Sequence, residues 1–327
     1  MAPHAPETRA PVLRADDDPR AAVRAVVAHH LRGLVRAEGT ARAGAVEGVH
    51  QLRVATRRLR AALRLFGPVL PARLVESCTA DLRWLGHCVG RVRDLDVLAA
   101  AIAACGARMA PPERPGVAAL QRDVAARRRE AHHELVALLE TPRCRRLLAR
   151  LQKLAATVPK RRAGEALGAR VGALLRPLVR AVQRAGRVVG PDAPAEALHA
   201  LRVRAKRLRY AVEIVAGLDA DTAALVGARL TALQEVLGDH QDAVMQAAWL
   251  RREAEAATLA TPTLLAAGAV IDRLERRAAK RRALVVRVWQ RLDRPKVRRA
   301  LSALCARRPA APAPVAPARP ATAGAAA

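Results

Sequence analysis

The chain has 327 residues, of which 58 are lysine or arginine and 29 are aspartate or glutamate, so its formal net charge is +29 and its pI about 11.7. This charge predicts a polyanionic partner, attracted at long range and bound with release of counterions. Aromatic residues make up only 2% of the chain, which argues against a protein that stacks single-stranded nucleic-acid bases on aromatic side chains. Strong helix formers dominate and β-rich stretches are missing, so the sequence predicts an all-α fold.

The predicted elements begin after a flexible lead-in, residues 1–18, which contains three prolines and a run of aspartates. Helical segments follow, separated by glycine and proline at residues 39–48, 67–71, 111–116, 159–164, 190–194, 217–221 and 261–262. The last segment, residues 308–327, is rich in proline and alanine and is predicted to be a disordered tail.

The five cysteines, at positions 78, 88, 105, 144 and 305, form no Cys-x-x-Cys pair and make a poor disulfide framework. The N-terminus shows no apolar stretch typical of a secretory signal. The longest apolar run, residues 97–107, is far shorter than the roughly 20 residues of a membrane-spanning helix. We therefore expect a soluble, cytoplasmic protein in a reducing compartment, without a membrane partner.

Two stretches of the chain are repeated. Residues 49–66, VHQLRVATRRLRAALRLF, match residues 198–215, LHALRVRAKRLRYAVEIV, at eight of 18 positions. Downstream, LGHCVGRVRDLDV at 85–97 is similar to LQEVLGDHQDAVM at 233–245. Two matches in the same order indicate a duplicated unit of about 150 residues. We predict two tandem, related four-helix bundles, at residues 19–158 and 163–307, with the two repeated helices in separate bundles.

Each copy of the repeated helix carries a basic stripe opposite an apolar one. In the first copy the basic stripe consists of His50, Arg53, Arg57, Arg60 and Arg64, and the apolar stripe of Leu52, Leu59, Leu63 and Phe66. In the second copy the basic residues are His199, Arg202, Lys206 and Arg209, with Glu213 at the position of Arg64, and the apolar residues are Leu201, Leu208 and Val212. The apolar stripes are predicted to face the core.

The basic stripe predicts a site for a polyanion. Residues 49–66 contain no acidic side chain, so no carboxylate within this stretch relieves the repulsion between its cations. Arginine suits phosphate because its planar guanidinium binds two oxygens at once. For His50 and His199, a bond to phosphate and a structural hydrogen bond are both open. Because Glu213 interrupts the second stripe, we expect the second copy to bind phosphate less strongly.

A metal site is a weaker alternative. Glu47–His50 and Glu196–His199 both read Glu-x-x-His, the spacing of di-iron sites in helical bundles. The neighbouring arginines would repel a cation, and a glutamate in the first turn suits the positive end of a helix, so we expect no metal and no cofactor. Motifs such as GxxxxGK[ST], HExxH and GxSxG are missing, and we expect no catalytic residues. The tryptophans at 84, 249 and 289 fall in apolar helical patterns and are predicted to be core residues or anchors between helices.

The two repeated helices and the segment VGRVRDLDV at 89–97 resemble the signature of the CHAD family, the conserved histidine α-helical domain. The resemblance covers residues 20–307. It implies two helical bundles around a basic central groove or channel that binds inorganic polyphosphate, and association with polyphosphate granules in the cytoplasm. By position in the motif, the implied binding residues are His50, Arg53, Arg57, Arg58, Arg60, His199, Arg202, Lys206, Arg207 and Arg209, with Arg93 as a lesser candidate and Arg64 added from the basic stripe.

Two other functions remain open. A nucleoid-type nucleic-acid-binding protein would also explain the charge, although no DNA-reading motif is present. A metal-dependent phosphohydrolase using His50 or His199 would need a carboxylate cluster that the sequence does not show. Family members are often fused to a phosphohydrolase domain with an ExExK signature, and Glu253-Ala-Glu255-Ala-Ala lacks the lysine. We therefore expect a stand-alone binding protein.

Overall fold

The computed structural model describes residues 10–111, 114–156, 165–256 and 260–306. All regular secondary structure in these ranges is helical, which confirms the predicted all-α class. The first half contains α1 (Pro19–Arg42), α2 (Val46–Leu65), α3 (Ala72–Gly106), α4 (Arg114–Leu139) and α5 (Pro142–Ala156). The second half contains α6 (Leu167–Arg187), α7 (Ala195–Ile214), α8 (Ala220–Glu255), α9 (Thr261–Leu292) and α10 (Pro295–Ala306). Short 3₁₀ turns, η1 (Gly67–Val69) and η3 (Ala216–Leu218), follow α2 and α7.

The described residues form five α-helices in each half, where the sequence analysis predicted four. The additional breaks fall directly before Pro142 and Pro295, at the starts of α5 and α10. Proline disfavours helical backbone in the residue before it and readily begins a helix, so both breaks have a local cause. The third helix is the longest in each half, with 35 residues in α3 and 36 in α8.

The prediction of a flexible lead-in over residues 1–18 is wrong for residues 10–18, which pack against the second half of the chain. Leu13 is buried. Two backbone carbonyl groups of this segment accept hydrogen bonds of 2.8 Å from the N–H groups of Leu167 and Gly168 at the start of α6. The N–H groups in the first turn of α6 have no acceptor within the helix, and they bind this segment instead.

Further predictions concern the two ends of the chain, the cysteines and the membrane. The first nine residues, the predicted tail at 308–327 and the bundle boundary at 158–163 lie outside the described residues. The five cysteines are free thiols. No helix in the described ranges is long and apolar enough to span a membrane.

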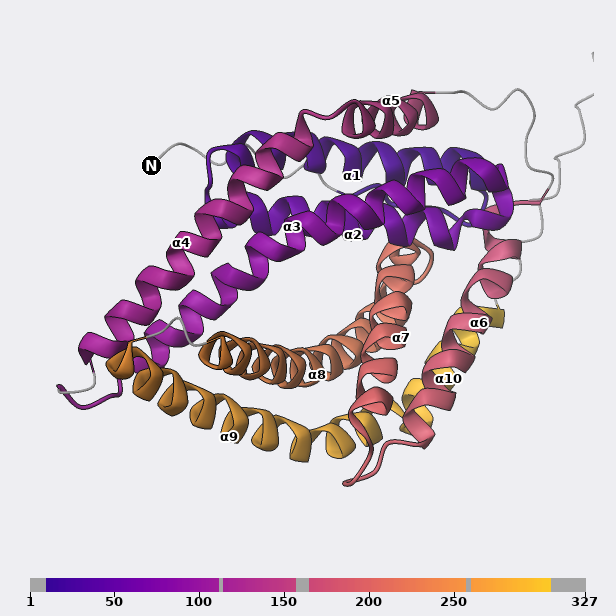
Figure 1. Cartoon of the computed structure of the whole chain (residues 1–327). Helices are drawn as coiled ribbons and strands as arrows, with labels where there is room; N and C mark the ends of the chain where they lie inside the picture. Colours follow the sequence, from indigo (N-terminus) through magenta and orange to yellow (C-terminus); the bar gives the residue numbers. More distant parts are fainter. Residues whose placement is uncertain (1–9, 112–113, 157–164, 257–259, 307–327) are drawn as a thin grey trace, which may run out of the picture.

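The helices close into a ring (Figure 1). In the first half α1, α2, α3 and α5 pack together, and in the second half α6, α7, α8 and α10. Besides the contact of residues 10–18 with α6, the helices of the two halves pack together at two places: α2 packs against α7, and α4 packs against α9 beside the far ends of α3 and α8. The two repeated helices thus belong to different halves and contact each other, and one continuous apolar core runs through both halves.

The apolar stripes of the repeated helices are buried in this core, as predicted. Leu52, Leu59 and Leu63 of α2, and Leu201 and Leu208 of α7, have no exposed surface. Burial of each such side chain contributes about 1.5–3 kcal/mol, so the two stripes hold α2 and α7 in a fixed rotation about their axes. That rotation decides where the basic stripes point.

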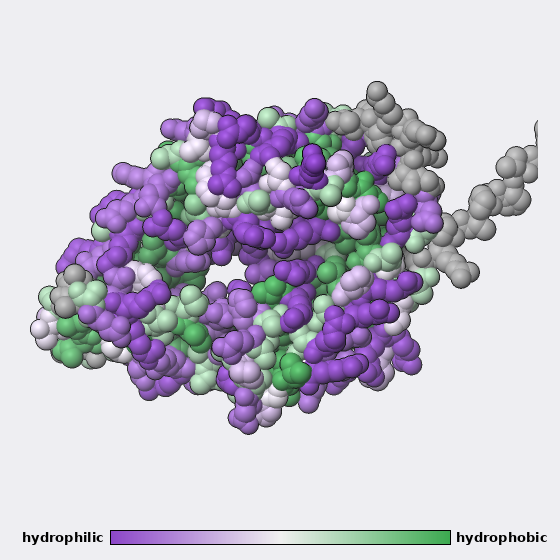
Figure 2. Space-filling view, turned by 45° about the vertical axis from the view of Figure 1, so that its right-hand side comes forward, coloured by the Kyte–Doolittle hydropathy of each residue, from purple (hydrophilic) through white to green (hydrophobic). Residues whose placement is uncertain are grey.

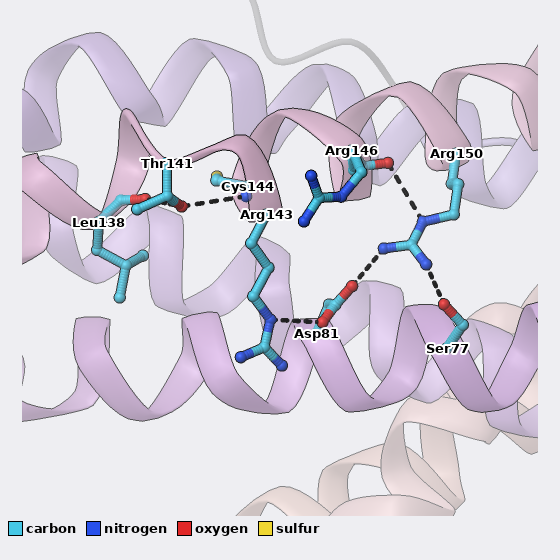
Figure 3. A network of polar contacts seen from close by, with 8 residues as sticks. All are labelled: Ser77, Asp81, Leu138, Thr141, Arg143, Cys144, Arg146 and Arg150. Carbon is cyan, nitrogen blue, oxygen red and sulfur yellow. Dashed lines mark hydrogen bonds and ion pairs between the residues drawn. The ribbon is translucent and has the colours of Figure 1, made fainter.

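Asp81 of α3 ties α5 to the first half (Figure 3). Arg143 donates from Nε to one Asp81 oxygen at 2.8 Å, and Arg150 binds the other oxygen and the Ser77 hydroxyl. The Arg143 guanidinium carbon also lies 4.4 Å from the centre of the Trp84 ring, a cation–π contact. Trp84 is therefore half-buried, packed against the core and covered by an arginine of another helix, in keeping with its predicted role as a core residue or an anchor between helices.

Candidate functional site

A cavity of about 720 Å³ lies inside the ring, between side chains of α2, α3, α4, α7 and α8. The space-filling view shows an opening through the middle of the molecule (Figure 2). Seven arginines and four carboxylates line the cavity. The predicted binding residues on its wall are His50, Arg53, Arg57, Arg93, His199 and Arg202.

Matching arginines of the two copies meet at the centre of this wall. Arg53 pairs with Asp94 of α3 at 3.6 Å, and Arg202 pairs with Asp242 of α8 at 3.7 Å. Burial lowers the pKa of Arg53; Asp94 opposes this, and the positive charge of Arg57 adds to it. Asp242 and Arg202 act on the same guanidinium from the other half of the chain, so the two ion pairs lie close together.

A glycine makes room for Arg53. A Cβ atom at Gly90 would lie 2.3 Å from Arg53 Nη1, and the same nitrogen donates to the Gly86 carbonyl at 3.4 Å. Gly238, the matching glycine of the second copy, has no atom within 4 Å of its Cβ position. The close approach of arginine to helix backbone is therefore a feature of the first copy.

Lys206 lies beside the cavity wall, close to Arg57, Arg202 and Arg53. Burial first, and then these three positive charges, lower the pKa of Lys206 from its ordinary 10.5 to about 7, against the opposing charge of Asp242. Near neutral pH the lysine is therefore only partly protonated. A bound anion would restore its full charge.

The two histidines lie on the cavity wall, and each is the fifth residue of its helix. Burial and the charge of Arg93 lower the pKa of His50, so its ring is neutral at pH 7 and offers a donor or an acceptor. His199 lies with Nδ1 3.4 Å from Gln241 Oε1 of α8. The structure thus gives His199 a protein partner as well as a place on the cavity wall.

Tyr210 connects the two repeated helices. Its hydroxyl accepts a hydrogen bond of 2.5 Å from Arg57 Nη2, and the guanidinium carbons of Arg57 and Arg209 lie 5.6 and 4.8 Å from its ring centre. The side chain is buried. Because Arg57 belongs to α2 and Tyr210 to α7, this contact orients a cavity arginine from the opposite half. Sequence reasoning missed Tyr210, although it is the only tyrosine of the chain and lies within the second copy.

Two of the predicted residues, Arg58 and Arg209, are close to Glu213 and do not line the cavity. Arg209 forms an ion pair with Glu213 and donates from Nε to Gln234 at 2.9 Å. Arg58 lies 4.0 Å from the same carboxylate and lines a separate pocket of about 160 Å³ with His30. These two arginines are therefore occupied by a carboxylate of the protein itself.

The three remaining predicted arginines and one further arginine form a group that we call the outer cluster. It consists of Arg60 and Arg64 of α2, Arg83 of α3 and Arg207 of α7. None of the four lines the central cavity. Arg83 was not predicted, because its approach to α2 depends on the packing of α3.

Further cavity residues were missed by sequence reasoning. These are Arg91 of α3, Arg127 of α4 and Arg252 of α8. The Arg127 guanidinium carbon lies 5.5 Å from the centre of the Trp249 ring, and Trp249 lines the cavity while it packs against the smaller apolar core. Trp289, by contrast, is buried as predicted. No local pattern identifies Arg127, because α4 reaches the cavity only through closure of the ring.

No three His, Cys, Asp or Glu side chains come together as metal ligands in the ranges that the structure describes. Glu47, from the first Glu-x-x-His sequence, accepts a hydrogen bond of 2.5 Å from Gln51 on its own helix.

The chain matches the family model of the CHAD domain over residues 25–251. Uncharacterized proteins MT2285 and Rv2226 of Mycobacterium tuberculosis (strains CDC 1551 / Oshkosh and H37Rv) are each 32% identical over 249 residues, 73% of this chain and 46% of the relative. The chain thus spans about half the length of these curated relatives. The crystal structure of the CHAD domain from the plant Ricinus communis superposes with a TM-score of 0.70 at 27% identity, covering 92% of this chain and 98% of that one. PptA from Streptomyces chartreusis shares the fold, with a TM-score of 0.68 at 21% identity, covering 85% of this chain and 100% of the other.

Proposed function

The chain belongs to the CHAD domain family, and we propose that it binds inorganic polyphosphate at the central cavity. The observation that carries the proposal is the meeting of the two repeated helices. Arg53 and Arg57 of α2 lie close to Arg202 and Lys206 of α7, and burial followed by the charges of the three arginines lowers the pKa of Lys206 to about 7. Such mutual repulsion opposes folding, and a chain of phosphates relieves it.

Binding of this kind is electrostatic and depends little on the identity of the chain ends. Arginine forks bind pairs of phosphate oxygens, and each neutralised phosphate releases counterions. By analogy with single-stranded nucleic acids, contacts to about eight phosphates would weaken affinity roughly a thousandfold between 50 and 200 mM salt.

The proposal is for a binding protein without catalytic activity, associated with polyphosphate granules in the cytoplasm. Asp94 and Asp242, at the centre of the cavity wall, are each paired with an arginine, which competes with a divalent cation for their oxygens. We expect no phosphate release from polyphosphate in the presence of Mg²⁺ or Mn²⁺. Release that depends on His50 or His199 would support the phosphohydrolase alternative instead.

The test compares affinities for long-chain polyphosphate of the wild type and two triple variants. The cavity variant is Arg53→Gln/Arg57→Gln/Arg202→Gln, and the α6 control variant is Arg180→Gln/Arg184→Gln/Arg187→Gln. Both variants remove three positive charges, but the control residues lie on the exposed face of α6. We expect the cavity variant to lose affinity about 100-fold and the control only a few-fold.

The competitor in the same experiment is duplex DNA at fixed salt. Polyphosphate binding that resists DNA supports the proposal. Equal competition by DNA would support the nucleic-acid alternative, and equal losses in the two variants would reduce the site to bulk charge.

A further inference from the structure

The outer cluster holds four cations without a carboxylate partner. Arg60, Arg64, Arg83 and Arg207 approach one another from α2, α3 and α7. In the part of the chain that the structure describes, none of them is within ion-pair distance of an acidic side chain. Positive charges gathered in this way create a strong local potential for an anion.

Arg60 forms the floor of the cluster. Its Nε atom is buried and has no hydrogen-bond partner among the described residues, and its Nη1 lies 4.0 Å from the Cβ position of Gly86. Arg64, Arg83 and Arg207 are exposed around it. Burial and then these three charges lower the pKa of Arg60 to about 10, so the repulsion within the cluster is unrelieved.

In the second copy, one of the positions that match the outer cluster is occupied by a carboxylate, Glu213. The matched pairs are Arg60 with Arg209, Arg207 with Arg58, and Arg64 with Glu213. Glu213 forms an ion pair with Arg209 and lies 4.0 Å from Arg58. In this copy the chain supplies its own anion, and in the first copy the corresponding place is held by a further cation.

We propose that the outer cluster is a phosphate-binding site. At the matching place of the second copy, the Glu213 carboxylate pairs with the arginines and prevents phosphate from binding. An anion at the first site would replace the carboxylate that Glu213 supplies at the second. Arg57 of the cavity wall lies one helical turn from Arg60, so a polyphosphate chain held in the cavity continues into the outer cluster. This last step rests on the proposed function, whereas the site itself requires only phosphate oxygens.

The first experiment counts bound tripolyphosphate per chain by isothermal titration calorimetry. The variant is Arg64→Gln/Arg83→Gln, and the matched control is Arg180→Gln/Arg184→Gln, which removes the same charge from the outside of α6. All four residues are exposed, so both variants should fold. We expect the first variant to lose one equivalent of tripolyphosphate, with that site weakened at least tenfold, and the control to keep it. Equal behaviour of the two variants would overturn the proposal.

The second experiment removes the carboxylate charge from the matching place of the second copy. Glu213→Gln should add one equivalent of tripolyphosphate per chain, and Glu213→Asp, which keeps the charge, should add none. No gain with Glu213→Gln would contradict the role of Glu213.

Titration with long-chain polyphosphate distinguishes failure of the proposed function from failure of the outer cluster alone. A wild-type chain that does not bind the polymer at low salt refutes the proposed function. A wild-type chain that binds it, with Arg64→Gln/Arg83→Gln equal to its control, refutes the outer cluster alone.

Discussion

Polyphosphate binding should take up a proton at Lys206. The pKa of this lysine is about 7 because it is buried among Arg57, Arg202 and Arg53. A phosphate chain placed between these groups opposes their repulsion and returns the pKa toward the ordinary 10.5. At pH 8 the free protein holds about 0.1 proton at this site and the complex about one, so binding takes up about 0.9 proton.

The same numbers set the pH dependence of affinity. Between pH 6 and pH 8 the wild type should lose about tenfold in affinity, or about 1.4 kcal/mol. Lys206→Met should bind more weakly than the wild type at pH 6 and lose the lysine's share of the pH dependence. Lys206→Arg, which stays charged, should retain the pH 6 affinity at pH 8.

The assay is isothermal titration calorimetry at pH 8 in buffers of different ionisation enthalpy, with long chains so that end groups contribute little. Protons taken up by other groups appear equally in the wild type and in Lys206→Met, so the difference between the two reports the lysine. A difference near zero would refute the reasoning.

The stability of the free protein gives an independent readout. Because the pKa of Lys206 is lowered by folding, the unfolded chain holds more protons between about pH 7 and 10.5, and stability contributed by this site rises with pH across that window. Below pH 7 the burial of protonated Lys206 lowers the free energy of unfolding by its full amount. Lys206→Met should therefore raise the free energy of unfolding at pH 6, by on the order of 2 kcal/mol, and the gain should shrink toward pH 10.

Two further predictions concern Gly90 and Asp81. Gly90→Ala places a Cβ atom 2.3 Å from the present position of Arg53 Nη1, so the guanidinium must move and polyphosphate affinity should fall about three- to tenfold. Gly238→Ala, which meets nothing within 4 Å, should leave binding unchanged and stabilise its helix by up to about 1 kcal/mol. Asp81→Asn removes the carboxylate shared by two arginines of α5 and should lower the free energy of unfolding in urea by about 2 kcal/mol. Glu140→Gln, at an exposed ion pair, should cost less than about 0.5 kcal/mol, and equal effects of these last two changes would contradict the role given to Asp81.

The faces of the repeated helices could be predicted from the sequence because helical periodicity is a local property. The burial of Leu52 and Leu59 in α2 and of Leu201 and Leu208 in α7 follows directly from it. The separation of α4 from α5, and of α9 from α10, also had a local signal in the proline that begins each second helix. The breaks predicted from glycine and proline did not include Pro142 or Pro295.

The division of the basic stripe could not be predicted, because it depends on how α2 crosses α7. His50, Arg53 and Arg57 reach the cavity, while Arg60 and Arg64, on the same stripe, join the outer cluster. The pattern gives the direction of each side chain relative to its own helix and says nothing of the helix opposite. Contacts between elements far apart in sequence, such as Arg57 with Tyr210, are of the same kind.

The most direct measurement of the central claim is the slope of log affinity for long-chain polyphosphate against log salt concentration. It is compared among the wild type, the cavity variant and the α6 control variant. With a slope of about 0.7 per phosphate contact, loss of three contacts predicts that the cavity variant's slope is smaller by about 2. The control variant should keep the wild-type slope. A cavity variant with the wild-type slope would show that the phosphates are bound elsewhere and would contradict the account.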